Sequence, residues 1–122
     1  MNRLFTMAFH IPGTLAADAA IKFVMPVNAQ LIHVQSVATN DSDATLKVGT
    51  SADDDGYIAA HTIGDSSVPT EKEAITDFAG ALAGSQYPHI TDGTIVVLTL
   101  DHDGAGGTAA QNVTIVLTFA EG

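Results

Sequence analysis

The sequence predicts an all-β fold, a jelly-roll-like antiparallel β-sandwich formed by one domain over residues 1–122. Three observations predict it. Apolar and polar residues alternate along most of the chain, which is the two-residue period of a half-buried strand. Turn residues divide the chain into about seven or eight such runs at intervals of roughly 10 to 15 residues. Eight strands match a jelly roll, whereas an immunoglobulin-like sandwich would bury a tryptophan, and the chain has none.

Three strands are predicted before residue 39. The first runs to a turn at Pro12–Gly13 and places on one face Phe5, Met7, Phe9 and Ile11. The second carries Ile21, Phe23 and Met25, and Pro26 stops it. Residues 29–38 alternate less cleanly, with Ile32 and Val34 on one face and Leu31 and Val37 on the other. This pattern predicts a strand that is covered on both sides or contains a bulge.

Four strands are predicted after residue 44, and the last two carry the strongest signals. Residues 45–49 point Leu46 and Val48 inward, and a strand over 57–63 follows. Residues 94–101 are rich in β-branched side chains. Residues 111–119 are predicted to be a central strand that buries Val113, Ile115, Leu117 and Phe119.

Residues 64–92 form a long excursion between strands. The stretch Thr70–Glu71–Lys72–Glu73 fits a helix capping box, and at helical spacing after it stand Ile75, Phe78, Ala79 and Leu82. We therefore expect one short helix that closes one end of the sheets. Connections of this length are uncommon in compact domains and are often functional, so the excursion is a candidate contact element.

The charge balance excludes two classes of partner. Fourteen acidic residues stand against four basic ones, for a net charge of −10. Such a surface repels phosphate backbones and anionic lipids, so we expect no nucleic acid and no membrane among the partners. The chain has no cysteine, which excludes disulfides and thiolate metal sites.

Two aspartate- and glycine-rich segments, "DDDG" at 53–56 and "DHDG" at 101–104, are open to two interpretations. Calcium binds carboxylate oxygens, which makes Asp53, Asp55, Asp101 and Asp103 weak metal candidates. Neither segment completes the twelve-residue calcium loop, because no glutamate follows at the required place. Aspartate and glycine are also the residues that tight turns require, and this second interpretation is favoured.

The chain lacks the signatures of an enzyme. Its histidines never form H-x-H or H-E-x-x-H, and its serines lack a G-x-S-x-G setting. A glycosidase would need two carboxylates across a groove, commonly with aromatic platforms, and there is no tryptophan here. We expect no catalytic residue and no cofactor.

Three segments resemble small β-sandwich proteins from the structural gene regions of tailed bacteriophages: "IPGTLAADAAIKFVMPVNAQLIHVQSVA", "ATLKVGTSADDDGYIAA" and "DGTIVVLTLDHDGAGGTAAQNVTIVLTFAEG". The likeness runs from about Phe9 to Gly122, departs at 64–92, and transfers no site residues. It implies a virion component made in the host cytoplasm, such as a capsid decoration (cement) protein on the head or a tail or fibre accessory. For a cement protein it further implies the major capsid protein as partner and a homotrimeric state.

The apolar first strand is the predicted interface, because a strand at a sheet edge needs cover. The interface candidates are Leu4, Phe5, Met7, Phe9 and Ile11. A second hypothesis is a jelly-roll recognition module that binds a host glycan, with calcium as an aid. It predicts exposed aromatic side chains and acidic loops at one end of the sandwich, and the sequence has the acidic loops but few aromatic residues. A third hypothesis, a non-viral carbohydrate-binding domain, is weaker because it needs the same aromatic side chains.

Overall fold

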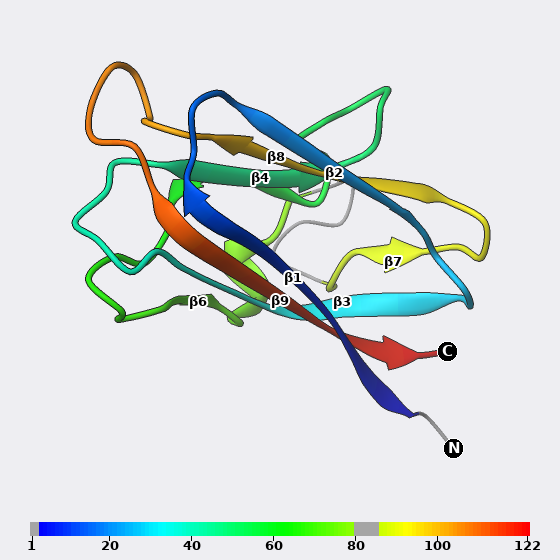
Figure 1. Ribbon diagram of the computed structural model, residues 1–122. Helices are drawn as coiled ribbons and strands as arrows, with labels where there is room; N and C mark the ends of the chain where they lie inside the picture. The colour runs from blue at the N-terminus through cyan, green and yellow to red at the C-terminus, as the bar shows by residue number, and fades with distance from the viewer. Residues whose placement is uncertain (1–2, 80–85) are drawn as a thin grey trace.

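The computed structural model describes residues 3–79 and 86–122, which form two antiparallel sheets packed face to face (Figure 1). The first sheet has the order β1-β9-β3-β6, with β7 also paired to β3. Its strands are β1 (Leu4–Thr14), β9 (Gln111–Glu121), β3 (Ala29–Val37), β6 (Thr70–Lys72) and β7 (His89–Ile90). The second sheet has the order β2-β8-β4-β5. Its strands are β2 (Ala19–Val24), β8 (Ile95–Asp101), β4 (Thr45–Gly49) and β5 (Ile58–Thr62).

The strand order confirms the predicted fold class. Successive strands cross from one sheet to the other at β1–β2, β2–β3, β3–β4, β5–β6, β7–β8 and β8–β9. These crossings place the first and last strands, β1 and β9, side by side and produce the interlocked Greek keys of a jelly roll.

The core lies between the two sheets and follows the alternation of the sequence. β9 lies between β1 and β3, and it buries Val113, Ile115, Leu117 and Phe119, as predicted. β8 contributes Val96, Leu98 and Leu100 from the opposite sheet. Leu46 and Val48 of β4 also point inward, which confirms that prediction.

A bulge in β3 corrects the expected faces of that strand. The register between β3 and β9 shifts between Leu31 and His33. Because the extra residue changes the phase of the alternation, Leu31 and Val34 both point into the core, while Ile32 is only half-buried. The bulge was one of the two predicted alternatives, but the placement of Ile32 and Val34 on one face is wrong.

The helix expected in the 64–92 excursion is also wrong over its described part. Thr70–Lys72 is a strand that pairs with Val34–Ser36 of β3. It is followed by a single 3-10 turn, η1 (Ile75–Asp77), whose Asp77 carboxylate accepts the N–H groups of Glu73 and Ala74. Leu82 lies outside the described residues. Tertiary packing decides the outcome, because buried Phe78 packs edge-on against Tyr87 and the Ala79 N–H donates to the Tyr57 carbonyl.

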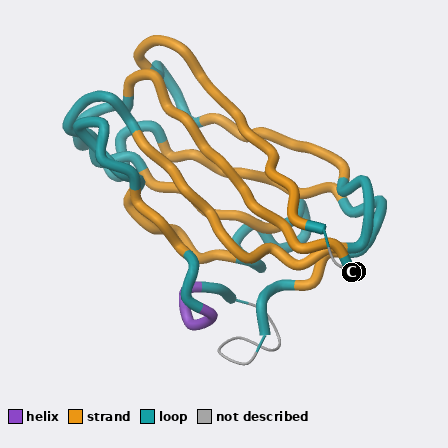
Figure 2. Tube along the Cα trace, turned by 90° about the horizontal axis from the view of Figure 1, so that it is seen from below, coloured by secondary structure: helices purple, strands orange, loops and turns teal. Residues whose placement is uncertain are grey.

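The excursion gives the sandwich one closed side and one open side. β6 and β7 both pair with β3, and the Ala79 N–H bonds to Tyr57 just before β5, so the described part of the excursion covers this side. The opposite side, between edge strands β1 and β2, has no such cover in the described chain (Figure 1). Loops gather at the two ends of the strands (Figure 2), with the chain termini at one end. No helix in residues 3–79 or 86–122 is long and apolar enough to cross a membrane.

Candidate functional site

The predicted interface residues of β1 divide between two faces of the strand. Leu4 is 68% exposed and points outward. Phe5, Met7, Phe9 and Ile11 point into the sandwich, where they are half-buried against the core. Because β1 is an edge strand of its sheet, these four side chains are exposed on one side, whereas the matching residues of central β9 are buried.

Aromatic contacts line the open side between β1 and β2. Phe9 of β1 stacks on Phe23 of β2 with ring centroids 5.4 Å apart, and Phe23 meets Phe119 edge-on at 6.3 Å. Phe5 stacks on Phe119 at 5.1 Å. These rings join the free edges of the two sheets, so the inward face of β1 is part of the core as well as a surface.

The outer edge of β1 presents unpaired backbone groups. The Glu121 N–H donates to the Arg3 carbonyl at 2.7 Å, which marks a hydrogen-bonded pair of the β1–β9 ladder. Hydrogen-bonded and non-bonded pairs alternate along an antiparallel ladder. The N–H and C=O groups of Leu4, Thr6, Ala8 and His10 therefore point away from β9, toward the free edge.

The outer face of this sheet is nearly free of charge. Its three long strands β1, β3 and β9, which are 11, 9 and 11 residues long, contain one Asp, Glu, Lys or Arg, namely Glu121. Thr114, Val116 and Thr118 lie at its centre. Carboxylates begin only at β6, where Glu71 accepts a hydrogen bond from Gln35 at 2.6 Å. In a chain with a net charge of −10, this neutral face with its free edge is the candidate docking surface.

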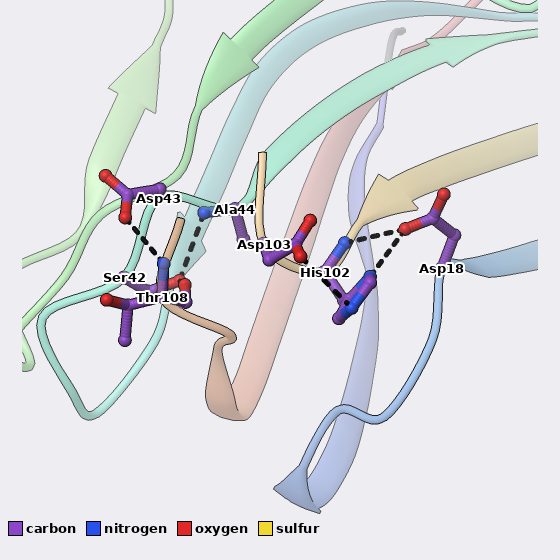
Figure 3. Close-up of polar contacts among 7 residues, drawn as sticks. All are labelled: Asp18, Ser42, Asp43, Ala44, His102, Asp103 and Thr108. Carbon is purple, nitrogen blue, oxygen red and sulfur yellow. Dashed lines mark hydrogen bonds and ion pairs between the residues drawn. The ribbon is translucent and has the colours of Figure 1, made fainter. Parts of the chain in front are cut away.

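An acidic cluster lies at the end of the sandwich opposite the chain termini (Figure 3). Asp18, in the β1–β2 connection, accepts hydrogen bonds from the backbone N–H of His102 at 3.1 Å and from its Nδ1 at 2.7 Å. The hydrogen bond lowers the pKa of Asp18 and raises the pKa of His102. The His102 Nε2 lies 3.5 Å from the Asp103 carboxylate. A protonated His102 thus bridges two carboxylates from different loops.

The neighbouring glycine-rich loop is held by the β3–β4 connection. The Asp43 carboxylate accepts the Thr108 N–H at 2.7 Å, and the Ser42 hydroxyl donates to the Thr108 carbonyl (Figure 3). A Cβ at Gly107 would collide with the Asp43 carboxylate, and one at Gly104, whose φ is +70°, would collide with the Asp43 carbonyl. These contacts explain the glycines of the segment after β8, and they support the turn interpretation.

The second acidic segment, Asp53–Asp55, lies beyond the other end of β4. The Thr50 N–H and the Gly56 N–H both donate to the Asp53 carbonyl, which closes a turn. Asp54 forms an ion pair with Lys47 at 2.9 Å. The pKa of Asp53 is raised by its hydrogen bond with Asp55. All three aspartates are exposed.

The structure therefore does not unite the four calcium candidates. In the part of the chain that is described, two groups have ligand atoms within 4.8 Å of one another, Asp53–Asp54–Asp55 and Asp18–Asp101–His102. Asp53 and Asp55 belong to one group, Asp101 belongs to the other, and Asp103 to neither. Sequence reasoning missed Asp18 and His102, because a separation of 84 positions in the sequence leaves no local motif.

Comparisons with known proteins match the fold. No protein-family model matches the chain. No curated protein matches it either. A chain from a solved structure described as the "Cyanophage Pam1 capsid asymmetric unit" matches with a TM-score of 0.55 and 19% sequence identity. The match covers 99% of this chain and 85% of that chain. At this identity the likeness shows a shared fold along the whole sandwich.

Proposed function

We propose that this protein is a structural component of a bacteriophage capsid, a decoration (cement) protein that binds the outside of the head and stabilises it. The observation that carries the proposal is the fold shared over 99% of the chain with a chain of a cyanophage capsid. The resemblance of three segments to structural proteins of tailed bacteriophages supports the same role independently.

The surface of the sandwich suits attachment to a larger assembly. The outer face of β1, β9 and β3 offers neutral side chains beside a free strand edge, while most carboxylates of the described chain lie outside the strands. The major capsid protein is the proposed partner. Three copies around a local symmetry axis of the head are the proposed arrangement, in keeping with the sequence resemblance. The neutral face would lie against the particle, and the acidic loops would keep the complex soluble.

The alternative of a glycan-binding recognition module is less well supported. That role calls for exposed aromatic side chains, and each of the five Phe and two Tyr residues belongs to the core or packs against it. It also calls for acidic loops at one end of the sandwich. Asp53–Asp55 follow the last residue of β4, whereas Asp101 pairs with its first residue, Thr45, so the two segments lie at opposite ends of β4.

Heat resistance of particles tests the proposed role. Heads assembled without the protein should release DNA at a lower temperature than complete heads, and purified protein added back should restore the release temperature. An unrelated acidic β-sandwich protein added at the same concentration is the control and should restore nothing. If heads without the protein are as robust as complete ones, the stabilising role is wrong and the recognition module becomes the better account.

A further inference from the structure

We propose that the free edge of β1 is where the particle attaches, by adding an extended, weakly charged segment of the capsid protein as a further strand beside β1. This inference rests on the proposed function and specifies its contact surface. The four outward pairs of backbone groups, at Leu4, Thr6, Ala8 and His10, supply the hydrogen bonds for such a strand.

β1 differs from the other sheet edges in length and charge. Exposed edge strands usually carry devices against unwanted pairing, such as short length, a lysine or a bulge. β6 has three residues and includes Glu71 and Lys72, and β2 has six residues with Lys22 near its middle. β5 has five residues and a register shift against β4. β1 runs for eleven residues without Asp, Glu, Lys or Arg, and its register shift comes only after Ile11.

The surface beside this edge is neutral as well, so an added strand would meet no charged side chain on the outward faces of β1 and adjacent β9. Outward side chains of β1 are Leu4, Thr6, Ala8 and His10, and those of adjacent β9 include Thr114, Val116 and Thr118. The one polar contact between these two sets of side chains joins His10 Nδ1 and Thr114 Oγ1 at 2.9 Å. Side chains of an incoming segment would therefore find small, uncharged neighbours, which suits alternating Thr, Val, Ala or Ser residues.

Symmetry favours the capsid over a second copy as the occupant. A second copy on this edge would pair β1 with β1 about a two-fold axis, because an edge that joins itself makes a self-complementary contact. The proposed arrangement has three copies around one axis, and a two-fold contact does not build it. A capsid segment on this edge is compatible with three copies, and the net charge of −10 on this chain favours a neutral or basic segment.

Ala8 and Ala20 provide matched positions for the test. Both are exposed alanines on edge strands, Ala8 on β1 and Ala20 on β2. The Met25 N–H donates to the Thr94 carbonyl, so alternation along the β2–β8 ladder turns the backbone of Ala20 outward too. Proline at either position removes an outward N–H and leaves the existing ladder intact. Lysine at either position tests the same edge through charge, with no change to the backbone.

The experiment measures binding of purified full-length protein to heads that lack it, by co-sedimentation over a concentration series. Wild type, Ala20→Pro and Ala20→Lys should bind alike, while Ala8→Pro and Ala8→Lys should bind about tenfold more weakly or worse. Circular dichroism melts identify the variants that fold. If Ala8→Pro does not fold, the binding of Ala8→Lys decides the test.

Folded Ala8 variants that bind like wild type would overturn the inference and leave the proposed function standing. Wild type that fails to bind heads would overturn both. Stable dimers of wild type that Ala8→Pro abolishes would show that a second copy, and not the capsid, occupies the edge.

Discussion

Phe9 and Phe23 stack across the open side of the sandwich, with ring centroids 5.4 Å apart, although they belong to different sheets. The pair closes the gap between the free edges of β1 and β2. It also means that β1 cannot be removed without exposing the core. Deletion of residues 1–11 would uncover Phe23 and Phe119 and turn central β9 into an edge strand. Substitutions on the outward face of β1 are therefore cleaner tests of binding than deletion.

Phe119 is expected to be the most costly single truncation. It is fully buried in β9 and contacts the rings of Phe5 and Phe23. Phe119→Ala should lower the free energy of unfolding by about 3–5 kcal/mol, because it leaves a cavity that the β-sandwich fills poorly. Denaturant titration measures the loss. Leu4→Ala, at a residue that is 68% exposed, is the control and should change stability by about 0.5 kcal/mol or less. A loss below about 1 kcal/mol for Phe119→Ala would contradict the assignment of this residue to the core.

The Asp18–His102 pair should give stability a pH dependence with a definite sign. The raised pKa of His102 means that its contribution is present below the ordinary value of 6.5 and is lost as pH rises through the folded value. The lowered pKa of Asp18 means that its contribution is present above 3.8 and is lost as pH falls through the folded value. The pair therefore contributes most between these two pH values.

Asp18→Asn should bring the titration midpoint of His102, followed by NMR, down toward the ordinary value. The melting temperature of this variant should also fall less than that of wild type when the pH is raised from 5 to 8.5. Asp41→Asn, which removes an exposed carboxylate from a neighbouring loop, is the control and should leave the His102 midpoint unchanged. An unchanged midpoint in Asp18→Asn would show that the pair does not persist in solution.

A side chain at Gly107 should destabilise the protein. A methyl group there collides with the Asp43 carboxylate that holds the Thr108 N–H. Gly107→Ala should cost about 1–3 kcal/mol of stability, in the range of overpacked sites. Ala105→Ser, at an exposed position of the same loop, should cost about 0.5 kcal/mol or less. Equal melting curves for the two variants would mean that Asp43 does not clamp this loop.

Chelation should leave the melting temperature nearly unchanged. Asp103 lies beside His102, Asp54 pairs with Lys47, and the Asp53 carbonyl closes its own turn. A bound calcium ion that stabilised only the native state would make melting depend on the ion concentration. Differential scanning fluorimetry with excess EDTA and with added calcium makes the comparison. A drop of many degrees in EDTA would replace the turn interpretation with a metal site.

Strands such as β9 were predictable because the alternation of apolar and polar residues in the sequence matches the alternation of buried and exposed side chains. Phe119 and Leu117 stand two residues apart in a strand of β-branched and apolar residues, and no long-range information was needed to place them inward. The 70–79 segment was not predictable in the same way. Its helical spacing is real, but pairing of Thr70–Lys72 with β3 and burial of Phe78 outweigh a weak local preference.

Some polar features could be predicted from the sequence, and others depend on the strand order. Aspartate and glycine composition indicated turns after β4 and β8, and the hydrogen bonds of Asp53 and Asp43 support that interpretation. The pairing of Asp18 with His102 had no local signal, because only the jelly-roll topology brings the β1–β2 connection beside the end of β8. The free edge of β1 likewise becomes visible only when the strand order is known.

Copy number in purified virions tests the central proposal most directly. A decoration protein that covers the head should be present in hundreds of copies per particle, in a fixed ratio to the major capsid protein. Quantitative mass spectrometry with isotope-labelled peptides, normalised to the major capsid protein, gives this number. Hundreds of copies, lost together with the heat resistance of the head, are the result that the account predicts. A few copies per particle, as for a tail or fibre protein, would contradict it.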